Sequence, residues 1–413
     1  MQSLERVEHE GETVDVGTER SYEFYRVALE GQSFPCAFVD RDRLDANAEA
    51  IRARADGLPV RVASKSVRCL SVLDRVLAMD GFEGLMCYSG HEACYLAEAG
   101  FDDLLIAYPL WGGGEIEAAC DAIERGASVQ VMVDSVEHVT RISEIAADRG
   151  IGVPLCLDLD LSTEHFGIHF GVRRSGIQTP EAALSVCEAA SETPAVEIRG
   201  LMGYESQLAG MPDYSPGNNP VMNAGIRLLK RLSRPEVKRR RVSVVQAIER
   251  AGYELDLVNG GGTGCVEFTR EDPSVTEITV GSGLYSPALF DYYNAFQHFP
   301  AAGFAVEITR NPAPGIHTCR GGGYIASGPP SEDRQPKPWF PEGVEFREEE
   351  GAGEVQTPVR YDGPRELRLG DPVFFRHAKA GELAEQFEQL HLISGGEVVE
   401  TVPTYRGDGR AFI

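Results

Sequence analysis

The sequence predicts an α/β protein, a (β/α)8 barrel of the TIM type followed by a C-terminal, mainly-β domain. Three observations support this class. From residue 60 onward, short apolar runs alternate with amphipathic segments. The runs are continuous rather than alternating, which is typical of parallel strands covered on both faces. After residue 300, strand patterns separated by turn-rich loops replace the helical ones.

Eight apolar runs are expected to form the barrel, over nearly the ~250 residues typical of one. Helical patterns such as HEACYLAEAG and SVEHVTRISEIAADRG separate them. An earlier strand, CAFVD (36–40), could belong to another sheet. In chain order the eight runs are VRVAS (60–64), GLMCY (84–88), DLLIA (103–107), VQVMV (129–133), VPLCLDL (153–159), RGLMG (199–203), LDLVN (255–259) and EITVG (277–281).

The predicted division is a barrel domain over residues 36–300 and a β domain over 301–413, completed by residues 1–35. The β domain is expected to contain the strands AVEITR, EVQTPVRY, DPVFF and GEVVETVPTY. The connection 205–225 is long and rich in Gly, Pro and Asn, which is typical of lids, binding loops and interface elements. We expect this connection to take part in closing the site.

Composition indicates a soluble globular protein, with 42% hydrophobic and 25% charged residues among 413. The acidic start has no apolar signal core, so we expect a cytoplasmic location. A net charge of −25 argues against nucleic-acid and anionic-membrane partners. The basic run KRRR (238–241) is expected to be a solvated helix start. Nine cysteines without a C-x-x-C pair indicate reduced thiols.

Lys65 ends the first predicted barrel strand, where a buried ammonium group would be costly. Active sites of such barrels lie at the C-terminal ends of the strands, so Lys65 is predicted at the catalytic mouth. A nucleophilic amine must be unprotonated, which a low-dielectric site favours, and arginine cannot do this work. The alternative is that Lys65 reaches into solvent from the barrel rim.

Glycine-rich turns follow the seventh and eighth strands, where such barrels commonly bind phosphate. The first is NGGGTGC, in which backbone N–H groups can converge on an anion. The second, VGSGLY (280–285), adds a hydroxyl. A phosphate site facing a lysine predicts pyridoxal phosphate linked covalently to Lys65. The residues expected around the phosphate are Gly261, Gly262, Thr263, Gly264 and Ser282.

Four segments carry a family resemblance: residues 35–69 around Lys65, FGVRRSGI (170–177), RGLMGYES (199–206) and VNGGGTG (258–264). They resemble the fold-type III enzymes that use pyridoxal phosphate, over nearly the whole chain. The resemblance is closest to the D-threonine aldolase and D-serine dehydratase branch. It implies a homodimer, with Arg174 near the phenolic oxygen of the cofactor and Tyr204 in the site.

That branch binds a metal through a His-x-Cys motif, and FFRHAKAGELAEQF (374–387) is the matching segment. His377 fits the histidine, but Lys379 stands in the place of the cysteine. Because an ammonium group is not a metal ligand, we predict that the metal is lost and that Lys379 supplies positive charge instead. The alternative is that other residues complete a metal site. The pairs His317 with Cys319 and His165 with His169 are expected in strand and loop structure.

The resemblance implies a lyase acting on a small β-hydroxy amino acid of D configuration. Two reactions stay open: retro-aldol cleavage to glycine and an aldehyde, and dehydration with deamination to a 2-oxo acid. In this hypothesis His377 is the base on the hydroxyl, Lys379 stabilises the alkoxide, and Lys65 exchanges the Cα proton. An amino-acid racemase is the alternative enzyme. A non-catalytic protein that binds pyridoxal phosphate for homeostasis, and a barrel for a phosphorylated substrate, are alternatives of other classes.

Overall fold

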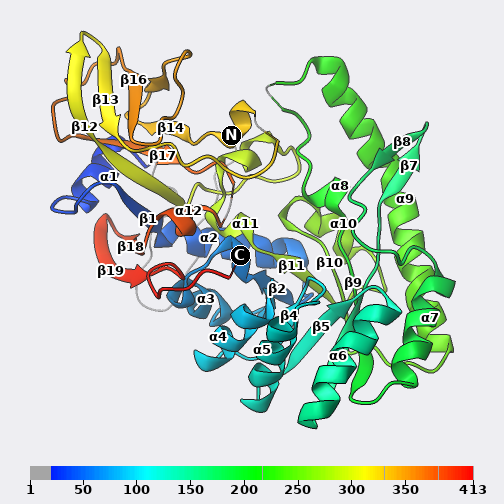
Figure 1. Ribbon diagram of the computed structural model, residues 1–413. Helices are drawn as coiled ribbons and strands as arrows, with labels where there is room; N and C mark the ends of the chain where they lie inside the picture. Colours follow the sequence, from blue (N-terminus) through cyan, green and yellow to red (C-terminus); the bar gives the residue numbers. More distant parts are fainter. Residues whose placement is uncertain (1–19, 216, 330, 380, 413) are drawn as a thin grey trace.

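The computed structural model describes residues 20–412 except 216, 330 and 380, and its centre is a closed parallel barrel (Figure 1). Each predicted barrel run forms a strand, so the predicted fold class is confirmed. Going around the barrel, the order is β10-β11-β2-β3-β4-β5-β6-β9. The strands are β2 (Val60–Ala63), β3 (Phe82–Cys87), β4 (Leu104–Ile106), β5 (Val129–Val133), β6 (Val153–Asp158), β9 (Val196–Gly203), β10 (Leu257–Gly260) and β11 (Glu277–Val280).

Helices cover the outside of the barrel, which explains why its strands are mainly apolar (Figure 1). Several begin at a capping side chain: the hydroxyls of Ser89, Ser135 and Thr179 accept hydrogen bonds from backbone N–H groups of α4, α6 and α7. Each cap stabilises its helix by ~1 kcal/mol. The helices are α2 (Arg41–Ala55), α3 (Leu70–Leu77), α4 (Gly90–Glu98), α5 (Gly113–Glu124), α6 (Val136–Arg149), α7 (Pro180–Ser191), α9 (Pro220–Arg250) and α10 (Val266–Arg270).

A second sheet of nine strands forms the β domain. Its central strand, β1 (Cys36–Asp40), pairs antiparallel with β12 and parallel with β18. The early strand therefore belongs to another sheet, although the domain boundaries 36–300 and 301–413 stay a prediction. The helix α1 (Tyr22–Ala28) adds buried Tyr25 to its aromatic core. The remaining strands are β12 (Ala302–Ala313), β13 (Ile316–Arg320), β14 (Lys337–Phe340), β15 (Glu345–Phe346), β16 (Gln356–Arg360), β17 (Pro372–Arg376), β18 (Gln389–Ser394) and β19 (Glu397–Pro403).

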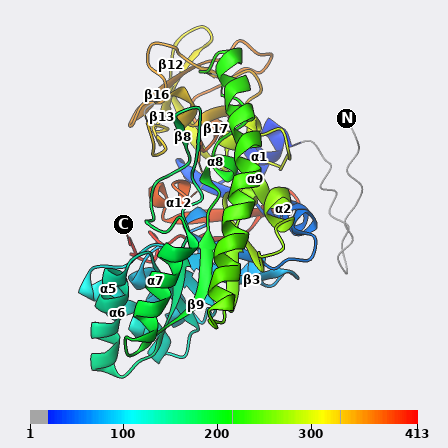
Figure 2. The same cartoon turned by 90° about the vertical axis from the view of Figure 1, so that its right-hand side faces the viewer.

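The connection after β9 differs from the predicted loop. It contains the short helix α8 (Ser206–Ala209), and its end is already part of α9, which extends beyond the barrel (Figure 2). The basic run 238–241 lies in the middle of α9, so its prediction as a helix start is wrong. The segment with His165 and His169, expected as a loop, instead forms a hairpin of β7 (Thr163–His165) with β8 (Ile168–Phe170). None of the helices in the described residues is both long and apolar enough to cross a membrane.

Candidate active site

A cavity of about 600 Å³ lies at the C-terminal ends of the barrel strands. Residues from the barrel strands, from the turns that follow them and from the β domain line it. The predicted site residues among its lining are Lys65, Arg174, Tyr204, Gly261, Gly262, Thr263, Ser282 and Lys379. Gly264 and His377 do not belong to the lining set.

Lys65 lies in a short 3-10 turn, Ser64–Ser66, directly after β2. Its Nζ donates a hydrogen bond of 2.6 Å to the hydroxyl of Tyr108, which follows β4. The turn itself is fixed, because Ser64 Oγ donates to the carbonyl of Met86 at 2.9 Å and Arg68 Nε donates to the carbonyl of Lys65 at 3.0 Å. The amine therefore lines the cavity from a fixed backbone, but Lys65 is an exposed residue rather than a buried one.

The two glycine-rich turns form a compact wall of the cavity. Gly261 has φ +92°, and a Cβ added there would lie 2.7 Å from Cγ2 of Ile278, so only glycine fits. Thr263 Oγ1 accepts a hydrogen bond of 3.0 Å from the backbone N–H of Gly283, which joins the two turns. Ser282 Oγ lies 3.3 Å from Ser66 Oγ, next to the lysine turn. The N–H groups of Gly261 and Gly283 already have protein acceptors, so an anion at this wall would be bound by the hydroxyls and by the other amides of the two turns.

A buried ionic cluster supports the glycine turn from behind. One carboxylate oxygen of Glu205 accepts a hydrogen bond of 2.6 Å from the N–H of Gly261. The other accepts from Thr269 Oγ1 at 2.9 Å and from Arg241. Arg241 also pairs with Asp272 at 2.9 Å, and the side chains of all three charged residues are fully buried. Arg241 is part of the basic run, so the expectation that this run is solvated is wrong for it.

Arg174 and Tyr204 line the part of the cavity beyond β6 and β9. Arg174 belongs to the segment that returns from the β7–β8 hairpin. Ser175 Oγ holds this segment by donating a hydrogen bond of 2.5 Å to the carbonyl of Asp158. Tyr204 directly follows β9, and burial raises the pKa of its hydroxyl, so that it stays protonated.

Lys379 reaches the same cavity from the β domain. Its Nζ donates a hydrogen bond of 3.3 Å to Ser327 Oγ. Burial lowers the pKa of Lys379; the carboxylate of Glu382 opposes this shift, and the positive charges of Arg334 and Lys65 add to it. The structure therefore brings the two predicted lysines together, one from each domain.

His377 is buried behind the cavity rather than exposed to it. The residue is 4% exposed, and its ring packs edge to face against Tyr285 with the ring centroids 6.3 Å apart. Neither ring nitrogen has a hydrogen-bond partner in the described part of the chain. Burial and the neighbouring Arg376 lower the pKa of His377 to about 3 and a backbone contact with Ala302 opposes them only in part, so the ring is neutral. This placement gives no support to the predicted role of His377 as a base.

The residues around His377 do not fit a divalent metal. The described residues contain no group of three or more His, Cys, Asp or Glu side chains that could hold a metal ion. Lys379 takes the place that the resemblance gives to a ligand. His317 lies in β13 and contacts Asn311 at 2.7 Å, as strand structure predicts. No step is therefore assigned to a metal.

The sequence analysis missed Asp158, which lines the cavity at the end of β6. Burial raises the pKa of Asp158 to about 7; the carboxylates of Asp134 and Asp160 act in the same direction, and Arg174 opposes them. The signal was present in the sequence. Like Lys65, Asp158 is a charged residue at the C-terminal end of a continuous apolar run.

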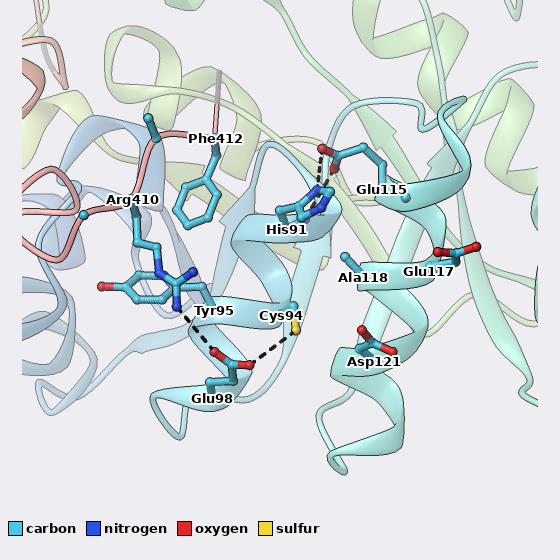
Figure 3. Close-up of a pocket in the computed structure, with 13 residues that line it drawn as sticks. His91, Cys94, Tyr95, Glu98, Glu115, Glu117, Ala118, Asp121, Arg410 and Phe412 are labelled. Atoms are coloured by element: carbon cyan, nitrogen blue, oxygen red, sulfur yellow. Dashed lines mark hydrogen bonds and ion pairs between the residues drawn. The ribbon is translucent and has the colours of Figure 1, made fainter.

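A second cavity, of about 640 Å³, lies outside the barrel between α4, α5 and residues 409–412 (Figure 3). The guanidinium of Arg410 lies 5.3 Å from the ring centroid of Tyr95 and 3.9 Å from a carboxylate oxygen of Glu98. Phe412 contacts the same tyrosine ring at 5.5 Å. None of the predicted site residues lines this groove. Its lining contacts attach the segment 409–412 to the barrel.

Comparison with known proteins gives a consistent set of relatives. The family model described as alanine racemase, N-terminal domain, matches residues 39–288. The 3-hydroxy-D-aspartate aldolase of Paracoccus denitrificans (strain Pd 1222) is 25% identical over 256 residues, which are 62% of this chain and 60% of that protein. The D-threonine aldolase of an Arthrobacter species is 25% identical over 254 residues, again 60% of each chain. The alignments thus span about 60% of the length of these relatives.

Solved structures share the fold over most of the chain. The D-threonine aldolase from Filomicrobium marinum has a TM-score of 0.76 at 19% identity, covering 91% of this chain and 95% of that one. The D-threo-3-hydroxyaspartate dehydratase from Delftia sp. HT23 has a TM-score of 0.74 at 18% identity, covering 91% and 98%. At these identities the likeness concerns the fold.

Proposed function

This chain belongs to the family of the alanine racemase N-terminal domain, and on that premise we propose that it is a lyase that uses pyridoxal phosphate to cleave small β-hydroxy D-amino acids. The observation that carries the proposal is the shared cavity, in which Lys65, the two glycine turns and Lys379 are brought together. The aldolases among its relatives support the choice of a lyase over a racemase.

The cavity residues fit pyridoxal phosphate. Lys65 offers a primary amine for covalent attachment, and the turns at Gly261 and Ser282 offer amides and hydroxyls for the phosphate. Arg174 and Tyr204 would contact the ring of the cofactor. The resemblance places Arg174 near its phenolic oxygen. When bound, pyridoxal phosphate withdraws electrons from the Cα of an amino acid and so weakens the bonds to that atom.

The chain's own side chains would then transfer protons and stabilise charge. In the dehydration alternative, Lys65 is the proposed group for removing the proton at Cα. Lys379, close to Lys65 and partly buried, supplies positive charge for an oxygen that develops negative charge. Tyr108 holds Lys65 in position through its 2.6 Å hydrogen bond. A homodimer and a cytoplasmic location remain predictions.

Product analysis tests the function directly. The protein loaded with pyridoxal phosphate would be incubated separately with the D and L forms of threonine and serine, and glycine and 2-oxo acid would be assayed separately. We expect consumption of a D isomer. Glycine as product identifies aldol cleavage and 2-oxo acid identifies dehydration. Neither product from the D isomers would contradict the proposal, and inversion at Cα alone would favour the racemase.

A further inference from the structure

Resting on the proposed function, we propose that Asp158 is the acid–base catalyst that acts on the substrate hydroxyl. His377, the base that the sequence predicted, does not line the cavity. A base must come within hydrogen-bond reach of the proton that it removes. The role therefore falls to a titratable side chain of the cavity wall.

Four carboxylates line the cavity, and three of them already have partners. Asp160 accepts hydrogen bonds from the N–H of Ser162 at 2.6 Å and from Gln178 at 2.9 Å. Glu382 accepts from the N–H of Ser327, and Glu385 pairs with Arg68. The remaining one, Asp158, has no hydrogen bond or salt bridge to its carboxylate among the described residues. Its oxygens are thus the ones available to a bound molecule.

The position of Asp158 suits the role. The strand β6 is four places from β2 in the ring of eight, so Asp158 faces Lys65 across the barrel mouth. The charged groups around Asp158 are Asp134 and Asp160, which favour its protonated form, and Arg174, which favours the carboxylate. A proton affinity near neutrality suits a group that must both take and return a proton.

In the cleavage reaction Asp158 both removes and returns one proton, so no further acid or base is needed. The carboxylate of Asp158 takes the proton of the β-hydroxyl, and the O–H electron pair becomes the second bond of the aldehyde carbonyl. The Cα–Cβ bond breaks and its electron pair remains at Cα. The protonated Asp158 then returns the proton to Cα, giving glycine and regenerating the carboxylate.

The test compares wild type with Asp158→Asn, Asp158→Glu and Asp134→Asn. We expect Asp158→Asn to retain bound pyridoxal phosphate but to lose ~10²–10⁴-fold in kcat for cleavage, with partial rescue by glutamate. In wild type, kcat/KM is expected to rise with pH through about 7. Asp134→Asn removes a negative neighbour, so this limb should move to lower pH. Burial also raises the pKa of Glu92 to about 7, but Glu92 does not line the cavity and Asp134 does not contribute to its shift, so Asp134→Asn distinguishes the two carboxyl groups.

A second readout needs no turnover. Because the pKa of Asp158 is raised in the folded state, its ionisation destabilises the protein as pH rises toward and through about 7. The Tm of Asp158→Asn minus that of wild type should therefore increase between about pH 5 and pH 8. The inference would be overturned by a Tm difference that does not change with pH, or by a kcat of Asp158→Asn within three-fold of wild type. It would also be overturned if the pH dependence of Asp134→Asn matched that of wild type, or if Asp158→Asn lost the cofactor. Wild type without lyase activity would instead refute the proposed function.

Discussion

Substitution of Glu205 by glutamine is expected to weaken both the fold and the glycine turn. The fully buried carboxylate pairs with Arg241 and accepts hydrogen bonds from Gly261 and Thr269. Removing one partner of a buried ion pair typically costs 3–5 kcal/mol, because the other charge is left uncompensated. Here Arg241 keeps its ion pair with Asp272 at 2.9 Å, and the amide oxygen of the introduced glutamine can still accept one hydrogen bond. We therefore expect the lower end, about 3 kcal/mol of unfolding free energy.

The assay is chemical denaturation followed by far-UV circular dichroism, which reports the helices around the barrel. Glu254→Gln is the matched control, because its side chain is 87% exposed and lies 4.0 Å from Arg199. Because this ion pair is exposed, Glu254→Gln should change the unfolding free energy by less than about 0.5 kcal/mol. A double-mutant cycle with Arg241→Met isolates the pair, and the combined loss should be smaller than the sum of the single losses.

The affinity for pyridoxal phosphate supplies a second measure for the same variant. The N–H of Gly261 loses a charged acceptor, so the glycine turn is held less firmly. We expect weaker cofactor binding in Glu205→Gln and unchanged binding in Glu254→Gln. The reasoning is refuted if Glu205→Gln loses less than about 1 kcal/mol, or if its loss and that of Arg241→Met are additive.

Three further outcomes are expected. Lys65→Ala should abolish both turnover and the cofactor adduct that borohydride fixes to the protein; an adduct in that variant would place the attachment elsewhere. Activity should survive a chelator, because Lys379 lies where the resemblance expects a metal ligand; strict dependence on Mn²⁺ or Zn²⁺ would contradict this. His377→Leu should keep turnover and fold stably, because neither buried ring nitrogen has a hydrogen-bond partner among the described residues; loss of cleavage with cofactor retained would restore its predicted role as base.

The barrel could be predicted from the sequence because its signals are local. Continuous apolar runs define the strands, and the parallel topology places all their C-terminal ends at one rim. For this reason Lys65 and the glycine turns could be assigned to one cavity before the structure was known. The second sheet was only partly predictable, since the pairing of β1 with β12 and β18 joins segments from both ends of the chain.

Side-chain direction and distant pairing could not be predicted. The sequence motif identifies His377 as the matching residue, but it does not predict the direction of the side chain. In the structure the ring packs against Tyr285 and lies away from the cavity. Arg241 reads as one of four basic residues in a surface run. Its partners Glu205 and Asp272 lie on other elements, so no local pattern reveals a buried cluster.

The central place of β1 in the second sheet has a consequence for biosynthesis. One of its edges pairs with β12 and the other with β18, and both partners are translated only after all eight barrel strands. Until then the nascent chain exposes an apolar strand with unpaired backbone groups, a state prone to aggregation. Lys379 is also translated late, so the barrel mouth acquires its second lysine only after the barrel strands have been made.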